Sequence, residues 1–199
     1  MEEDLIKKIF YQYLCKLSNY TKLNNYTKLI NPPKIKSQSS PGPDFIMEGK
    51  AYECKGTKFD EKNLFSQLLS YGLQYSQIGL IIPYDALNFK LLWKLEALEK
   101  FLEKSIEIYL IASYGEKNYA VYCWSSARML NSEISSILYY LGQNFKNIPI
   151  EEKEKKIINF LDAIETQIKE EFKKYTIDKA KNAKNIWEGA LINLDLYQT

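Results

Sequence analysis

A chain of 199 residues is long enough for one domain with a substantial core, and its hydrophobic fraction of 46% is ordinary for a globular protein. A formal net charge of +2 does not by itself indicate a nucleic-acid-binding protein. The absence of histidine excludes imidazole catalysis and histidine metal ligands. Three cysteines without a CxxC pair argue against a zinc site and indicate a reducing compartment.

The expected location is the cytoplasm. No segment approaches the roughly 18 consecutive apolar residues of a membrane span, and the acidic start "MEEDLIKK" is unlike a secretory signal. Abundant isoleucine, asparagine, lysine and tyrosine suggest an AT-rich genome, such as that of a virus or mobile element. In the viral case the location would be the host cytoplasm.

The first half of the chain predicts a helix, a connection, a hairpin and a second helix. Residues 4–17 have the apolar spacing of an amphipathic helix, and residues 18–29, "SNYTKLNNYTKL", are expected to be loop or frayed helix. The stretch "NPPKIKSQSSPGP" predicts a mobile connection. Two short strands, "DFIM" and "KAYECKG", flank a turn at Glu48-Gly49. A helix follows, with Asp60 as N-cap. Its apolar stripe consists of either Leu64, Leu68 and Tyr71 or Leu69 and Leu73.

The second half predicts a buried strand followed by alternating elements. The nearly continuous apolar run "IGLIIPYD" is typical of a strand covered on both faces. A helix "LLWKLEALEKFLEK" and strands "SIEIYLIAS" and "NYAVYCWS" come next. The order β-β-α-β-α-β-β predicts an α/β fold, with a central mixed sheet flanked by helices over residues 1–125.

Residues 126–199 are expected to form a helical extension that packs on this core or on a partner subunit. Ile157, Leu161, Ile164, Ile168 and Phe172 recur at helical spacing, and a last helix is predicted over Ile177–Leu194. The apolar stripe is interpreted as packing, either within the chain or between subunits of a homodimer.

The hairpin combines residues that strands usually exclude. Glu53 and Lys55 share one face of their strand, and Tyr52 and Cys54 share the other. With the turn centred on Glu48-Gly49, Asp44 is expected opposite Glu53, with Cβ atoms roughly 4.5–5.5 Å apart. Two facing carboxylates repel each other unless a divalent cation lies between them, and oxygen ligands suit Mg²⁺ or Mn²⁺. The pattern therefore predicts a metal site beside the Lys55 ammonium.

These residues resemble the motif of the PD-(D/E)XK nuclease superfamily. "PD" at Pro43-Asp44 and "ECK" at Glu53 to Lys55 match its signature, and "QLLSY" at Gln67 to Tyr71 looks like the QxxxY helix motif of RecB-type nucleases. By motif the likeness covers about residues 43–75. By element order it extends from the first helix to about residue 125 of the predicted core, which would then be a restriction-endonuclease-like αβα unit.

The resemblance implies a Mg²⁺- or Mn²⁺-dependent deoxyribonuclease, similar to archaeal Holliday junction resolvases or RecB-like exonucleases. Asp44, Glu53 and the Cys54 backbone carbonyl would hold the metal. Lys55 would orient the attacking water or stabilise charge on the phosphate. Family analogy places Gln67 and Tyr71 at the site, and a first-helix acid, Glu3 and then Glu2, is the weakest of these assignments.

Simpler interpretations apply to each residue taken singly. Asp44 is also explained as a turn residue, Glu53 and Lys55 as an exposed self-neutralising face, and Cys54 as a small core residue. Gln67 and Tyr71 are explained nearly as well as a surface amide and a packed ring. The acids near the start of the first helix also suit its dipole.

A lysine-rich segment near the C-terminus is a candidate DNA contact. Its cations suit a phosphate backbone but also suit a solvated helix face; they are Lys173, Lys174, Lys179, Lys181 and Lys184. Two other function classes stay open. One is a nuclease-like protein that binds DNA without cutting it, and the other is a protein-interaction module.

Overall fold

The computed structural model describes residues 1–23, 34–35, 42–142, 166 and 168–197. Of the expected loop or frayed helix at residues 18–29, residues 18–23 continue the first helix, Glu3–Leu23, and the rest lie outside these ranges. The expected mobile connection over residues 31–43 lies mostly outside them, but Lys34–Ile35 forms a short strand that was not predicted. The apolar positions 157, 161 and 164 also lie outside the described residues. None of the helices that the structure describes combines the length and the apolar character needed to cross a membrane.

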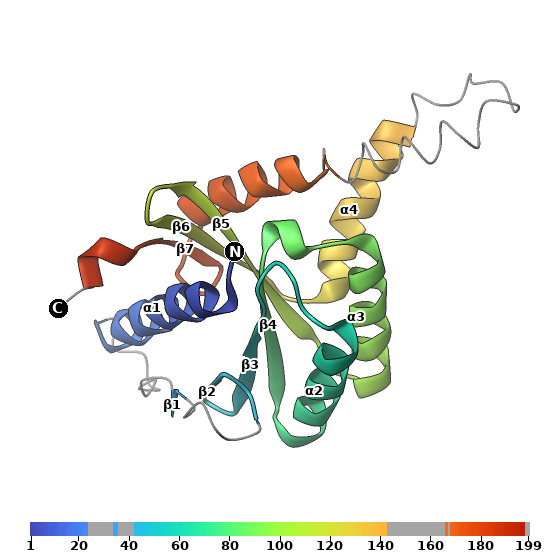
Figure 1. Ribbon diagram of the computed structural model, residues 1–199, viewed down its shortest axis with the longest axis horizontal. Coiled ribbons are helices and arrows are strands. Elements are labelled where there is room, and N and C mark those ends of the chain that lie inside the picture. The colour runs from blue at the N-terminus through green and yellow to red at the C-terminus, as the bar shows by residue number, and fades with distance from the viewer. Residues whose placement is uncertain (24–33, 36–41, 143–165, 167, 198–199) are drawn as a thin grey trace, which may run out of the picture.

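A seven-stranded mixed sheet forms the centre of the described structure, in the strand order β1-β2-β3-β4-β5-β6-β7 (Figure 1). Only the pairs β3/β4 and β4/β5 are parallel, and the other neighbours are antiparallel. The strands are β1 (Lys34–Ile35), β2 (Phe45–Met47), β3 (Lys50–Cys54), β4 (Gln77–Pro83), β5 (Ile106–Gly115), β6 (Asn118–Trp124) and β7 (Gly189–Asn193).

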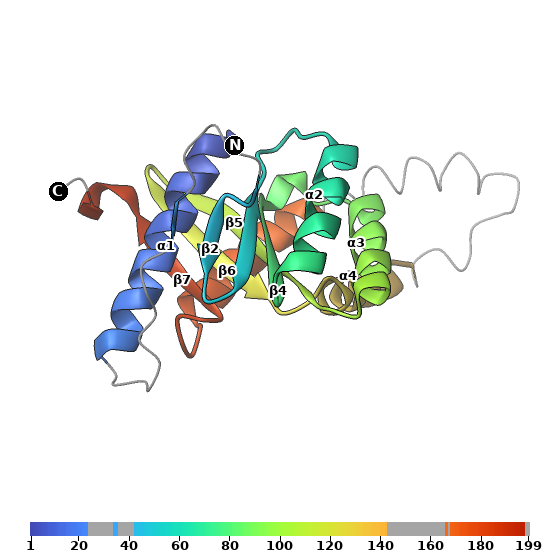
Figure 2. The same cartoon turned by 90° about the horizontal axis from the view of Figure 1, so that it is seen from below.

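Helices cover both faces of this sheet (Figure 2). Helix α1 packs on one face, and α2, α3 and α4 pack on the other. Their bounds are α1 (Glu3–Leu23), α2 (Glu61–Gln74), α3 (Phe89–Leu102) and α4 (Ala127–Gly142), with short 3₁₀ turns η1 (Tyr84–Ala86) and η3 (Leu194–Tyr197). Residues 168–181 form a further helix on the α4 side. The predicted α/β class is confirmed, and the elements from β2 to β6 follow the predicted order, whereas β1 lies in the segment predicted to be a mobile connection.

The hairpin of β2 and β3 has the predicted turn and register. Glu48 and Gly49 both have positive φ, of 52° and 77°, as a two-residue type I′ turn requires. Phe45 pairs with Tyr52 and Met47 with Lys50. The paired positions end there, one residue short of Asp44 and Glu53. The carboxylates therefore lie just beyond the end of the ladder.

The α1 face is held by a cluster of aromatic rings. Phe10 is fully buried, and its ring centroid lies 5.2 Å from that of Tyr52 and 5.0 Å from that of Tyr109. Gly79 on β4 makes room for this cluster, because a Cβ there would lie 2.6 Å from the Tyr52 ring. The start of α1 is thereby fixed against the carboxyl-terminal end of β3.

The α2 face is an aliphatic core. Leu64, Leu68 and Tyr71 are buried and Leu73 is 75% exposed, so the first of the two predicted stripes is correct. Asp60 caps α2 as predicted, since its carboxylate accepts a hydrogen bond of 2.8 Å from the Lys62 N–H.

The prediction of a last helix over Ile177–Leu194 is wrong in its second half. The helix ends near residue 181, and Gly189–Asn193 forms β7, which pairs antiparallel with β6. Strand β7 lies at the edge of the sheet, where it pairs with residues of β6 such as Tyr119 and Val121. Local sequence does not predict this pairing, because the partners are far away in the chain. Ile168 and Phe172 of the apolar stripe are buried in the chain's own core.

Candidate functional site

The site residues meet where β3 ends, between the start of α1 and the middle of α2. Strand β3 lies inside the sheet and is buried on both faces. Its pairing with β4 continues past Cys54, because the Lys55 N–H donates a 2.9 Å hydrogen bond to the Ile81 carbonyl. The backbone then turns at Gly56, where a Cβ would lie 2.9 Å from the Met1 carbonyl oxygen and 3.0 Å from the Glu3 nitrogen. Glycine at this position allows the loop after β3 to touch the first turn of α1.

Asp44 approaches the end of β3 from the neighbouring strand. Its Oδ2 accepts a 2.8 Å hydrogen bond from the Cys54 N–H, in place of a further ladder bond. Its Oδ1 lies 3.0 Å from the Lys7 ammonium of α1. Because the N–H and C=O of one strand residue point to the same side, the Cys54 carbonyl also faces the Asp44 side of β3.

Glu53 is a buried carboxylate, only 3% exposed. Its Oε1 lies 2.5 Å from the Lys55 ammonium, and its Oε2 accepts a 3.1 Å hydrogen bond from the Tyr71 hydroxyl of α2. Burial raises the pKa of Glu53 above the ordinary 4.5, and the nearby charge of Asp44 adds to the increase. Hydrogen bonds and charge from Lys55 and the bond from Tyr71 lower that pKa in part. The negative charge of Asp44 thus disfavours ionisation of Glu53.

Lys7 is a site residue that sequence reasoning missed. Its ammonium bridges Asp44 and Glu3, with a 2.7 Å contact to Glu3 Oε1. Burial alone would lower the pKa of Lys7, but the hydrogen bonds and charges of Glu3 and Asp44 raise it overall. The spacing of Glu3 and Lys7 along α1 was the only local signal, because an i, i+4 acid–base pair is common on exposed helices.

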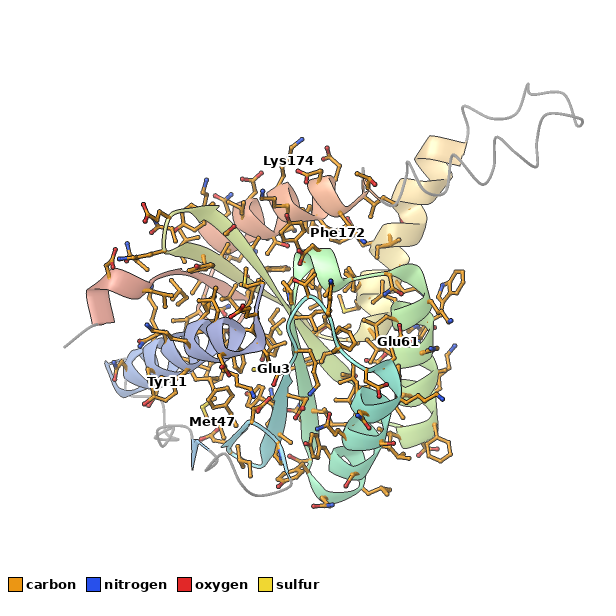
Figure 3. All side chains as sticks on the ribbon, in the orientation of Figure 1. Glu3, Tyr11, Met47, Glu61, Phe172 and Lys174 are labelled. Atoms are coloured by element: carbon orange, nitrogen blue, oxygen red, sulfur yellow. The ribbon has the colours of Figure 1, made fainter. Side chains whose placement is uncertain are left out.

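Glu3 and Gln67 line one pocket with Lys55 (Figure 3 shows Glu3 at the end of α1 nearest the central strands). The pocket has a volume of about 340 Å³, and Lys58 and Asn63 also contribute to its wall. The side-chain oxygen of Gln67 is buried, without a hydrogen-bond partner among the residues that the structure describes. Trp124 Nε1 and Thr176 Oγ1 are likewise buried without a partner among the described residues, and buried polar groups of this kind normally find a partner in a water or a ligand.

The Cys54 side chain is a small core residue, as the simpler interpretation of the sequence predicted. The side chain is fully buried among the α1-facing core residues, and burial raises the pKa of its thiol. A neutral, inaccessible thiol is a poor nucleophile. Only the backbone of Cys54 therefore contributes to the site.

The donor set suits a small hard cation. Two carboxylates, Asp44 and Glu53, and the Cys54 carbonyl belong to the end of the hairpin at β3, and Mg²⁺ in proteins commonly uses one or two carboxylates and keeps several waters. Within the described part of the chain, no group of three or more acidic, cysteine or histidine side chains forms a metal-binding cluster. Glu3 reaches Asp44 through the Lys7 ammonium, so the expectation that Glu3 joins the carboxylates directly is not met.

The predicted DNA-contacting lysines lie apart from the carboxylates, along the helix at residues 168–181 and the turn after it. Lys173, Lys179 and Lys181 each lie 5.0–5.9 Å from a tyrosine ring centroid, those of Tyr84, Tyr175 and Tyr114. Lys174 points outward, opposite the buried Phe172, and pairs with Glu171 at 3.1 Å (Figure 3). The Lys184 backbone N–H donates to Glu188.

Lys173 is linked to the site through the turn after β4. Tyr84, under its ammonium, is followed by Asp85, whose carboxylate oxygens lie 3.4 and 3.5 Å from the Thr57 hydroxyl. Thr57 belongs to the same loop as Lys55. The helix at residues 168–181 therefore begins on the side of the molecule where β3 and β4 end.

Comparison with protein-family models, with curated proteins and with solved structures finds no match to this chain.

Removing the Glu53 charge is expected to change how stability depends on pH. Since the pKa of Glu53 is raised on folding, the folded state binds the extra proton, and stability falls as pH rises from 4.5 through the raised value. The glutamine in Glu53→Gln does not titrate. In EDTA, the melting temperature of this variant minus that of the wild type should therefore increase as pH is raised from 4 to 7. A parallel pH dependence of the two proteins would contradict the burial argument.

Proposed function

We propose that this protein is a metal-dependent nuclease that hydrolyses DNA phosphodiester bonds. The observation that carries the proposal is that Asp44 is held at the Cys54 N–H, next to the buried Glu53 and its partner Lys55, at the end of β3. Burying a carboxylate such as Glu53 beside the charge of Asp44 costs free energy, which Lys7 and Lys55 offset in the metal-free protein and which a divalent cation would also offset. The resemblance of these residues to the PD-(D/E)XK motif and the helices on both faces of the sheet support a nuclease-like core.

Each protein group has a role that its position supports. Glu53 is oriented by Tyr71, and Asp44 by the Cys54 N–H, so that both carboxylates and the Cys54 carbonyl would hold Mg²⁺ or Mn²⁺. When bound, the ion would supply Lewis-acid polarisation of a phosphoryl oxygen. The Lys55 ammonium would stabilise negative charge that develops on the phosphate. The orphan oxygen of Gln67 would accept a hydrogen bond from substrate or from the attacking water.

The DNA backbone is proposed to lie along the helix at residues 168–181. Lys173, Lys179 and Lys181 are held over tyrosine rings, which limits the side-chain entropy lost when an ammonium contacts a phosphate. Lys174 and Lys184 are exposed on the same segment. The path from Lys173 through Tyr84 and Asp85 to the loop at Thr57 leads toward the carboxylates.

The test is a cleavage assay on linear duplex, single-stranded, flapped and four-way-junction DNA, with Mg²⁺, Mn²⁺ or EDTA. Cleavage of at least one substrate is expected with either metal and none with EDTA. Glu53→Gln should lose the activity, whereas Glu48→Gln, an exposed acid in the turn of the same hairpin, should keep it. Cleavage that survives in EDTA or in Glu53→Gln would overturn the proposal.

A nuclease-like protein that binds DNA without cutting it is the second candidate. It is favoured by a specific observation: all four oxygens of Asp44 and Glu53 already have donors, namely Lys7, the Cys54 N–H, Lys55 and Tyr71. Salt-sensitive DNA binding without cleavage and without Mn²⁺ uptake would support this candidate. Metal-dependent turnover would eliminate it.

A further inference from the structure

The Lys7 ammonium occupies the space next to Asp44 Oδ1 where a metal ion coordinated by Asp44 would lie. Asp44 has two oxygens, and the Cys54 N–H takes one of them as part of the strand end. The other, Oδ1, faces the Lys7 ammonium at 3.0 Å. A divalent ion at Asp44 would bring two positive charges next to a third, unless the ammonium moves away.

Glu3 is an alternative carboxylate partner for the Lys7 ammonium. Its Oε1 lies 2.7 Å from Lys7, one turn earlier on the same helix, so the side chain can leave Asp44 and keep a carboxylate partner. The side chains of Lys7 and Glu3 are 33% and 40% exposed, in contrast to 17% for Asp44. The exposed pair therefore has room to move, whereas Asp44 is held by the backbone.

We propose that Lys7 is a built-in counter-ion of the metal-free site, which competes with the divalent cation for Asp44, and that Glu3 is a positioning residue that takes over Lys7 when the cation binds. The proposal rests on the proposed metal-dependent function. It assigns Glu3 a role through Lys7, in place of direct metal ligation. It also accounts for an acid at the start of α1 that comes near the carboxylates without forming a cluster with them.

The test is Mn²⁺ binding by isothermal titration calorimetry, with the Mn²⁺-induced shift in melting temperature as a second measurement. The proteins are the wild type, Lys7→Met, Glu3→Gln and the double variant, with Lys8→Met as matched control. Lys8 is the exposed neighbour of Lys7 on α1, so its replacement removes the same charge without touching Asp44.

Lys7→Met is expected to bind Mn²⁺ about fivefold more tightly than the wild type, the size of effect expected for one partly exposed ion pair. Lys8→Met should stay within about twofold of the wild type. Glu3→Gln should weaken binding in the presence of Lys7, because the ammonium then has only Asp44. In the Lys7→Met background the same change should have no effect, whereas a metal-ligating Glu3 would weaken binding in both backgrounds.

The outcomes separate this inference from the proposed function. If the wild type binds Mn²⁺ and Lys7→Met binds no more tightly, the inference about Lys7 fails and the metal-dependent function stands. If the wild type does not bind Mn²⁺ but Lys7→Met does, the inference stands and the wild type is not a metal-dependent nuclease. Absence of binding in both folded proteins overturns both. Lys7→Gln is a second neutral variant, should Lys7→Met melt at a much lower temperature.

Discussion

Asp44→Asn is expected to abolish metal-dependent DNA cleavage, with a loss of at least about 10³-fold in kcat/KM. The ion's stabilisation of transition-state charge is worth several kcal/mol, and each 1.4 kcal/mol corresponds to a factor of ten. Asparagine keeps an oxygen that can accept from the Cys54 N–H, so the end of β3 should be retained. The charge that would bind the cation is lost, and with it the attraction for Lys7.

Three measurements distinguish this loss from misfolding. Cleavage kinetics should collapse, Mn²⁺ uptake by calorimetry should be reduced by at least about tenfold, and the melting temperature in EDTA should change by only a few degrees. Glu48→Gln, which removes one exposed negative charge in the turn of the same hairpin, is the control. If the wild type cleaves DNA, an Asp44→Asn variant that retains cleavage within about tenfold of it would remove Asp44 from the candidate site.

Phe10→Ala is expected to lower the free energy of unfolding by about 3–5 kcal/mol, the range for deleting a buried aromatic ring. The ring is 0% exposed and lies among four others. Its centroid distances are 5.6 Å to Tyr13, 5.9 Å to Phe45, 5.2 Å to Tyr52 and 5.0 Å to Tyr109. Deletion would leave a cavity where α1, the hairpin and β5 meet, which the surrounding rings fill only in part.

Urea denaturation measures this effect, with Phe101→Ala as control. Phe101 is 72% exposed on α3, and its truncation should change stability by less than about 0.5 kcal/mol. A loss below about 1.5 kcal/mol for Phe10→Ala would show that α1 is held by other contacts. Because α1 carries Glu3 and Lys7, the same cluster also positions the cationic side of the candidate site.

The candidate site connects the fold to the proposed chemistry in a specific way. Its carboxylates come from a hairpin, its hydroxyl and amide from α2, and its competing cation from α1. The metal-free arrangement is electrostatically satisfied by protein groups. Metal affinity is therefore expected to depend on how readily Lys7 and Lys55 give up their carboxylates, as well as on the ligands themselves.

Local patterns determined much of the fold. The two-residue turn at Glu48-Gly49 and the alternation of the flanking residues specified the hairpin register, since a shift by one residue would reverse every side chain. The apolar run of β4 identified a strand buried on both faces, and Asp60 identified the start of α2. Within the site, the same alternation brought Glu53 and Lys55 together, and helical spacing placed Gln67 and Tyr71 on one face of α2.

Tertiary structure alone decided the features that depend on partners distant in sequence. Strand β7 pairs with the edge of β6, and this pairing depends on residues about 70 positions earlier in the sequence. Gly56 is required because the first turn of α1 lies too close for a Cβ. Lys7 contacts Asp44 although 37 positions separate them in the sequence, and no periodic pattern in the sequence predicts that contact. The sequence by itself determined which residues alternate and which repeat along a helix, because those periods follow from backbone geometry. Which charge faces which carboxylate was decided by the packing of α1, through contacts that form only when the whole chain is folded.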